Sequence, residues 1–171
     1  MPYSDQQLGE MVRGDSVHRA LYTDPAIFEL EMQRIYGRAW VYVGHESQVP
    51  KTGDYHTTRL GDQDVLMVRA SDGRVHVLYN RCPHKGAKVV ADGDGCVGKF
   101  FRCPYHAWTF KLDGSHLGVP LKQGLEGTAY DPTDPGFSMR RLPRVESYRG
   151  FVFASQARDG QGLAEFLGGV R

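Results

Sequence analysis

Two short segments that each combine a cysteine with a histidine constrain this chain more than any other feature. The first is CPHKG at residues 82–86 and the second is CPYHAW at residues 103–108, with 18 residues between His84 and Cys103. Each segment offers one thiolate and one imidazole from a tight loop that contains proline. The fold therefore has to bring two separate loops together around a metal centre.

The two spacings, C-x-H and C-x-x-H, fit a Rieske [2Fe–2S] cluster. Two Cys hold one of its irons and two His hold the other, so each loop supplies one ligand to each iron. Two imidazoles in place of two thiolates raise the reduction potential to about −150 to +300 mV, against about −400 mV for plant-type clusters. The predicted ligands are Cys82 and Cys103 on one iron and His84 and His106 on the other.

A Cys2His2 zinc site is the alternative interpretation, because tetrahedral zinc takes the same ligand types. Structural zinc motifs usually open with two cysteines two to four residues apart. Both pairs here mix Cys with His, as a centre with two metals requires. A zinc-stabilised structural module is therefore the less favoured prediction.

Four neighbours of the ligands are expected to surround the cluster: Lys85, Gly86, Tyr105 and Trp108. Glycine lets the backbone take positive φ or approach the metal closely. The aromatic pair is expected to shield the cluster from water, which tunes its potential. Proline after each cysteine has no N–H, so the amides of His84, Gly86 and Tyr105 are the expected donors to the sulfurs.

Segments outside the loops carry a family resemblance. Residues 38–47 (RAWVYVGHES), 53–55 (GDY), 113–114 (DG) and 142–153 (LPRVESYRGFVF) are similar to segments in the large (α) subunits of Rieske non-haem iron ring-hydroxylating oxygenases. The benzoate, anthranilate and salicylate hydroxylating enzymes are the group resembled, over about residues 17 to 155. Two departures stand out: Lys85 replaces a common Arg, and Ala107 replaces a common Gly.

The resemblance implies a mostly β fold, an antiparallel β-sandwich with a small cluster-binding subdomain inserted at about residues 80–110. Residues 1–38 would form an N-terminal extension with an amphipathic helix at 25–36, where proline follows a capping Asp. The Rieske domain would occupy residues 39–156, and residues 157–171 would start a linker or helix toward a catalytic domain. The 21 Gly and 9 Pro agree with a fold rich in turns.

Alternating apolar residues and turn signals predict the strands. The expected ranges are 40–43, 55–60, 65–70, 75–79, 88–90, 97–102, 108–112, 140–146 and 151–154. A long surface loop is expected at 122–135, and a short amphipathic piece at 163–167.

The resemblance also implies the function: an electron-transfer domain that accepts single electrons from a ferredoxin or flavin reductase. It would pass them to a mononuclear Fe(II) in a catalytic domain of the same or a neighbouring subunit, within a homotrimer that can include β subunits. That iron is held by a 2-His-1-carboxylate triad, and the last histidine here is His116. The chain alone is therefore not expected to hydroxylate a ring. A free-standing Rieske ferredoxin is the alternative. Such ferredoxins usually start close to the first strand, whereas some 38 residues precede the first strand here.

Composition excludes other classes. A net charge of +1 shows no basic field for nucleic acid, and no apolar run reaches the length of a membrane span.

The extra disulfide of respiratory Rieske proteins cannot form with Ala87 and Tyr105 at the corresponding positions. Cys96 has no partner and is expected to be a buried thiol, which suits a reducing cytoplasm. The N-terminal residues 1–17 are polar, so no signal peptide is expected.

Overall fold

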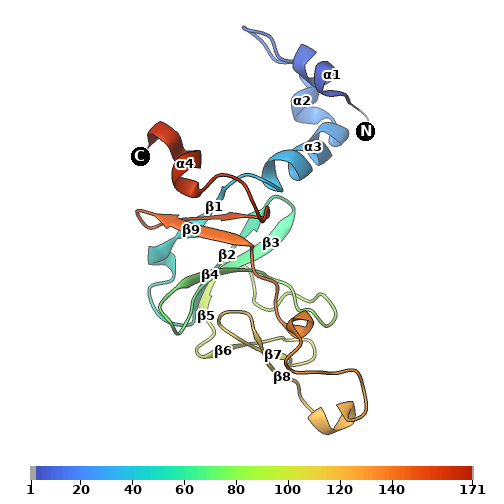
Figure 1. Ribbon diagram of the computed structural model, residues 1–171, viewed down its shortest axis with the longest axis vertical. Coiled ribbons are helices and arrows are strands. Elements are labelled where there is room, and N and C mark those ends of the chain that lie inside the picture. Colours follow the sequence, from blue (N-terminus) through green and yellow to red (C-terminus); the bar gives the residue numbers. More distant parts are fainter. Residues whose placement is uncertain (1–2, 171) are drawn as a thin grey trace.

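The computed structural model describes residues 3–170, and antiparallel strands form its central part (Figure 1). The strands within these residues form three sheets. The first has the order β1 (Val41–His45), β10 (Phe151–Ser155), β9 (Arg144–Tyr148), and the second has the order β4 (Val75–Tyr79), β3 (Gln63–Arg69), β2 (Asp54–Leu60), β5 (Asp94–Cys96). The third has the order β6 (Phe100–Arg102), β7 (Thr109–Lys111), β8 (His116–Gly118). This confirms the predicted mostly β, antiparallel fold.

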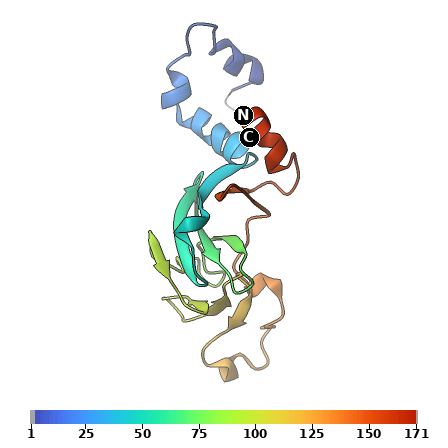
Figure 2. The same ribbon diagram turned by 90° about the vertical axis from the view of Figure 1, so that its left-hand side faces the viewer.

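Helical segments lie mainly toward the two chain ends. The α-helices are α1 (Asp5–Glu10), α2 (Ala20–Thr23), α3 (Pro25–Glu31) and α4 (Leu163–Leu167), and a π-helical segment, Met32–Tyr36, follows α3 directly. Short 3-10 turns occupy Glu46–Gln48, Lys122–Leu125, Pro135–Phe137 and Gly168–Val170. Figure 2 shows the helical end and the β6–β8 end at opposite poles of the molecule.

Strand β3 contributes side chains to both hydrophobic cores, because neighbouring residues of a strand face opposite sides. Val65 and Met67 pack in a core with residues of β1 and β10, whereas Leu66 and Val68 pack in a second core. The second core also contains Cys82 and Cys103, together with Phe101 and Phe110 from the third sheet. The half of the fold that contains β1 and β10 and the half that contains the two cysteines therefore share one central strand.

The helix predicted at 25–36 is present as α3 and the π-helical segment. The Asp24 side chain accepts a hydrogen bond from the Ala26 amide at 2.8 Å, and proline occupies the first turn. Ile27 and Leu30 are buried. Phe28 is 53% exposed, so the apolar face is narrower than the sequence pattern predicts.

Several predicted strands are wrong in their limits. Residues 88–90 form no strand, because the Asn80 side chain binds the backbone of Val89 and Val90. Residues 97–99 form the turn between β5 and β6, where Gly98 has φ +69°. The strand predicted at 140–146 begins only at Arg144, after a proline that cannot donate to a ladder. Strand β8 was not predicted.

No helix within residues 3–170 is long and apolar enough to cross a membrane. The predicted domain limits at 38/39 and 156/157 stay predictions. Of the predicted terminal segments, residues 1, 2 and 171 lie outside the described part of the chain.

Candidate metal centre

Both ligand loops close with the same backbone hydrogen bonds. In each loop the cysteine amide donates to the carbonyl five residues later, and the amide four residues later donates back to the cysteine carbonyl. The bonds are Cys82 to Ala87 (2.8 Å), Gly86 to Cys82 (2.9 Å), Cys103 to Trp108 (2.8 Å) and Ala107 to Cys103 (3.0 Å). The histidine comes third in the first loop and fourth in the second.

Asn80 fixes the base of the first loop. Its side chain is buried, with 2% exposure. The oxygen Oδ1 accepts from the amides of Val89 (2.9 Å) and Val90 (3.1 Å), and Nδ2 donates to the Val90 carbonyl at 2.9 Å. These three bonds tie the chain before the loop to the chain after it. Asn80 is not among the site residues predicted from the sequence, although an amide side chain directly after an apolar strand is a signal for it.

The two predicted cysteine ligands lie next to each other in the protein interior. Cys82 and Cys103 are 3% and 2% exposed, and neither forms a disulfide. Burial raises the pKa of the Cys82 thiol, and the neighbouring Cys103 adds to this rise. The amides of His84 and Lys85 donate toward the Cys82 sulfur, and these hydrogen bonds lower the pKa of the thiol. The Lys85 amide thus takes the place expected for Gly86, whose amide bonds the Cys82 carbonyl instead.

The two predicted histidine ligands form a second pair nearer the surface. The ring centroids of His84 and His106 are 4.7 Å apart, with 67° between the ring planes. Nδ1 of His84 is buried and has no hydrogen-bond partner among the described residues. Burial lowers the pKa of His84, and the charges of His106 and Lys85 add to this. The ring is therefore favoured in its neutral form, which is the form that binds metals.

These residues fit a [2Fe–2S] cluster. Two adjacent buried thiols would be stabilised as thiolates by metal ions, and a metal bond would satisfy the buried Nδ1. No group of three or more His, Cys, Asp or Glu side chains between residues 3 and 170 is placed to hold one ion. The thiols and the imidazoles instead form two neighbouring pairs.

The four predicted neighbours differ in their surroundings. Trp108 is half-buried and stacks on His84, with ring centroids 4.8 Å apart and 4° between planes. Tyr105 covers His106 at 3.8 Å between centroids, but the residue itself is 65% exposed. Lys85 is exposed beside His84, and Gly86 has φ +76°. His116 and Phe137, which were not predicted to belong to the site, contact Trp108, and Tyr130 contacts both of them.

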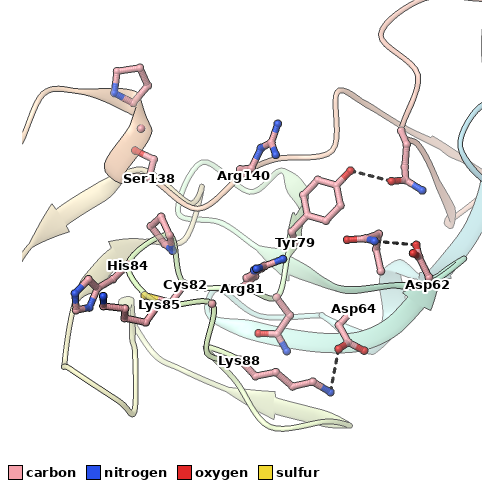
Figure 3. A pocket seen from close by; sticks show the side chains of 17 residues that line it. Asp62, Asp64, Tyr79, Arg81, Cys82, His84, Lys85, Lys88, Ser138 and Arg140 are labelled. Atoms are coloured by element: carbon pink, nitrogen blue, oxygen red, sulfur yellow. Dashed lines mark hydrogen bonds and ion pairs between the residues drawn. The ribbon is translucent and has the colours of Figure 1, made fainter.

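An open groove of about 1200 Å³ borders the first ligand loop (Figure 3). Its lining includes four cationic residues and two carboxylates: Arg81, Lys85, Lys88, Arg140, Asp62 and Asp64. Lys88 binds Asp64 at 3.3 Å and Asp92 at 2.9 Å, so part of the positive charge is already neutralised. The groove reaches His84 and therefore gives a partner access to this side of the site.

Cys96 is exposed at the end of β5, which corrects the expectation of a buried thiol. The next residue, Val97, packs against the core instead, because neighbouring residues of an extended chain face opposite sides. Four other histidines have polar neighbours of their own: His18 accepts from the Ala20 amide, His45 binds Ser47, His56 binds Asp94, and His76 lies near Asp72.

The sequence matches the family of the Rieske [2Fe-2S] domain over residues 39–133. The α subunit of N,N-dimethyl phenylurea N-demethylase from Sphingobium sp. (strain YBL2) is 39% identical over 150 residues, which are 88% of this chain and 32% of that subunit. The anthranilate 1,2-dioxygenase large subunit from Acinetobacter baylyi is 38% identical over 160 residues, 91% of this chain and 32% of that subunit. The chain thus spans about one third of the length of the curated relatives it matches.

Solved structures of similar fold lead to the same family. Naphthalene 1,2-dioxygenase from Rhodococcus sp., bound to indole, superposes with a TM-score of 0.81 at 33% identity, covering 89% of this chain and 34% of that one. A quaternary ammonium Rieske monooxygenase, whose study concerns carnitine oxidation by gut microbiota and inter-subunit electron transfer, gives 0.79 at 33% identity, covering 88% and 40%. With its matched residues, its fold and its relatives in agreement, the chain belongs to the Rieske [2Fe-2S] domain family.

Proposed function

We propose that this domain binds a [2Fe–2S] cluster and carries single electrons for a ring-hydroxylating oxygenase. Cys82 and Cys103 hold one iron, and His84 and His106 hold the other. The observation that carries this proposal is the buried, unpartnered Nδ1 of His84 next to two adjacent buried thiols. Such a set of groups is costly to bury without metal ions.

The chain's own residues prepare the site for one-electron chemistry. The cluster, when bound, accepts and releases one electron at a time. Amide N–H groups of His84 and Lys85 stabilise negative charge on the Cys82 sulfur. The thiols lie inside and the imidazole rings lie toward solvent, so the histidine edge is the shortest route for electrons between the site and a partner.

The proposed donor is a ferredoxin or flavin reductase, and the acceptor is a mononuclear iron in a catalytic domain of the same or a neighbouring subunit. The relatives named above are α or large subunits, which favours an oxygenase part over a free ferredoxin. We place the parent enzyme in the cytoplasm, in aromatic catabolism, as a homotrimer that can include β subunits. Exposed Lys85, Lys99 and Arg102 around the loops suit an acidic donor.

The test is the visible spectrum of the purified chain, oxidised and then reduced with dithionite, with iron and acid-labile sulfide assays. About two irons and two sulfides per chain, with absorbance that bleaches on reduction, are expected. Serine at either loop cysteine should abolish the colour, whereas Cys96→Ser, at an exposed position, should keep it. A colourless protein with one zinc per chain would refute the proposal.

A donor test separates an oxygenase part from a carrier. A catalytic subunit lacking its own Rieske domain should receive electrons from this chain only when the two are joined or assembled. Rapid, salt-sensitive transfer to several unrelated acceptors would instead support the free ferredoxin alternative.

A further inference from the structure

Trp108 links the first ligand loop to the rest of the subdomain. Its ring lies flat against His84, with 4° between the planes and 4.8 Å between centroids. A flat stack excludes water from one face of the imidazole and restricts its rotation. Whatever fixes Trp108 therefore also fixes His84.

Two further aromatic residues contact the Trp108 ring. His116, on β8, is 5.5 Å from Trp108 between centroids, and Phe137 is 5.8 Å away. The Nδ1 atom of His116 is buried without a hydrogen-bond partner among the described residues, whereas Nε2 lies 2.7 Å from the Tyr130 hydroxyl. Tyr130 and Phe137 also contact each other, 5.2 Å between centroids.

The His116–Tyr130 hydrogen bond connects an irregular loop to the rest of the domain. Within residues 3–170, it is the only hydrogen bond that joins residues 119–134 to a part of the domain outside 119–137. The chain that follows returns to β8, where the Ser138 hydroxyl accepts from the His116 amide at 3.0 Å. Pro135, Gly136 and Ser138 then line the groove beside His84 (Figure 3).

We propose that Tyr130 is a positioning residue for electron transfer: its hydrogen bond to His116 holds loop 119–137 against Trp108 and so fixes the orientation and hydration of His84. The inference rests on the proposed function, because it concerns His84 as a cluster ligand. Neither Tyr130 nor His116 touches His84, and both act through the Trp108 ring.

Loss of the hydrogen bond between His116 and Tyr130 should change the reduction potential of the domain. Reduction adds one negative charge at the site, and water stabilises that charge better than aromatic rings do. Without the hydrogen bond, loop 119–137 loosens and water gains access to His84. The reduction potential of the domain then shifts to a more positive value.

The experiment is a double-mutant cycle on the cluster-loaded chain with Tyr130→Phe, His116→Phe and the double variant. Both substitutions keep an aromatic ring and remove one partner of the hydrogen bond. Tyr3→Phe is the matched control, because it removes a tyrosine hydrogen bond to Asp24 in the N-terminal region. The readouts are the midpoint potential by protein-film voltammetry and amide hydrogen exchange of residues 119–137.

Each single variant should shift the potential positive and speed exchange of the loop, and the double variant should shift it no further than a single one. The control should match the wild type. Faster exchange with an unchanged potential, or shifts that simply add, would overturn the inference and leave the proposed function standing. A wild-type chain that holds no cluster would instead refute the proposed function itself.

Discussion

Gly86 and Ala107 occupy equivalent positions in the two ligand loops. Each lies four residues after the cysteine of its loop, donates its amide to that cysteine's carbonyl, and has positive φ, +76° and +56°. Glycine takes this conformation freely, whereas a Cβ atom costs about 1–2 kcal/mol there. Ala107, where the resemblance leads us to expect glycine, therefore lies in a strained backbone conformation.

Ala107→Gly should raise the free energy of unfolding by about 0.5–1 kcal/mol, since relief of strain is partly offset by the greater freedom of glycine in the unfolded chain. Urea unfolding of the cluster-free chain measures this. Gly86→Ala is the opposite change and should destabilise, because its Cβ would also lie 3.2 Å from Nε of Arg81. An equal loss of stability in both variants would contradict this account of the loops.

Asn80→Ala should lower the free energy of unfolding by about 2–4 kcal/mol, because it leaves the buried amides of Val89 and Val90 without their acceptor. The iron content after purification should fall with it. Gln63→Ala is a suitable control, since its hydrogen bond to Asp62 is exposed and worth little. A loss in Asn80→Ala as small as that of the control would show that the base of the loop does not depend on Asn80.

Stability should decrease in mild acid because of two half-buried histidines. Burial lowers the pKa of His116, and burial followed by the charge of Arg141 lowers the pKa of His76. In the unfolded chain these two histidines have a pKa of about 6.5, which is above their pKa in the folded chain. Their contribution to the free energy of unfolding is therefore complete above about pH 6.5 and is lost as the pH falls through the folded pKa. Urea unfolding at several pH values should show it, and His76→Gln should flatten the slope. An unchanged slope in that variant would exclude a contribution from His76.

Alkylation should distinguish the three thiols. In the cluster-loaded chain one label per molecule is expected on Cys96, because Cys82 and Cys103 are almost fully buried. Peptide mass spectrometry identifies the site, and Cys96→Ser should take no label. Labelling of Cys82 in the loaded protein would show that the ligand loops open readily.

Local sequence patterns predicted the parts of the fold that depend on local chemistry. The helix after Asp24 and the strands around Val65–Val68 follow from capping and from β-branched residues. Residues 88–90 look equally strand-like, but their backbone bonds the Asn80 side chain, which lies eight to ten residues earlier. Such competition between a side chain and a strand ladder depends on the tertiary fold, which no local pattern contains.

The candidate site also has one part that local sequence patterns predict and another part that depends on the tertiary fold. The cysteine and histidine spacings give the predicted ligands directly, because each pair lies within one short loop. The contact of His116 with Tyr130 spans 14 residues and an irregular loop, and β8 itself joins β7 with a register shift. A lone histidine and a lone tyrosine at that separation carry no pattern that a reader of the sequence could recognise.

The shared strand β3 has a mechanical consequence. A slip of one residue in its pairing would send Val65 and Met67 into the core that holds the cysteines, and would turn Leu66 and Val68 away from it. Both halves of the protein therefore keep each other in register. Strand β4, which pairs with β3, leads within a few residues to Asn80 and Cys82. Damage to the sheet far from the proposed metal ligands should for that reason misalign them, so that cluster retention would report on the integrity of the whole sandwich.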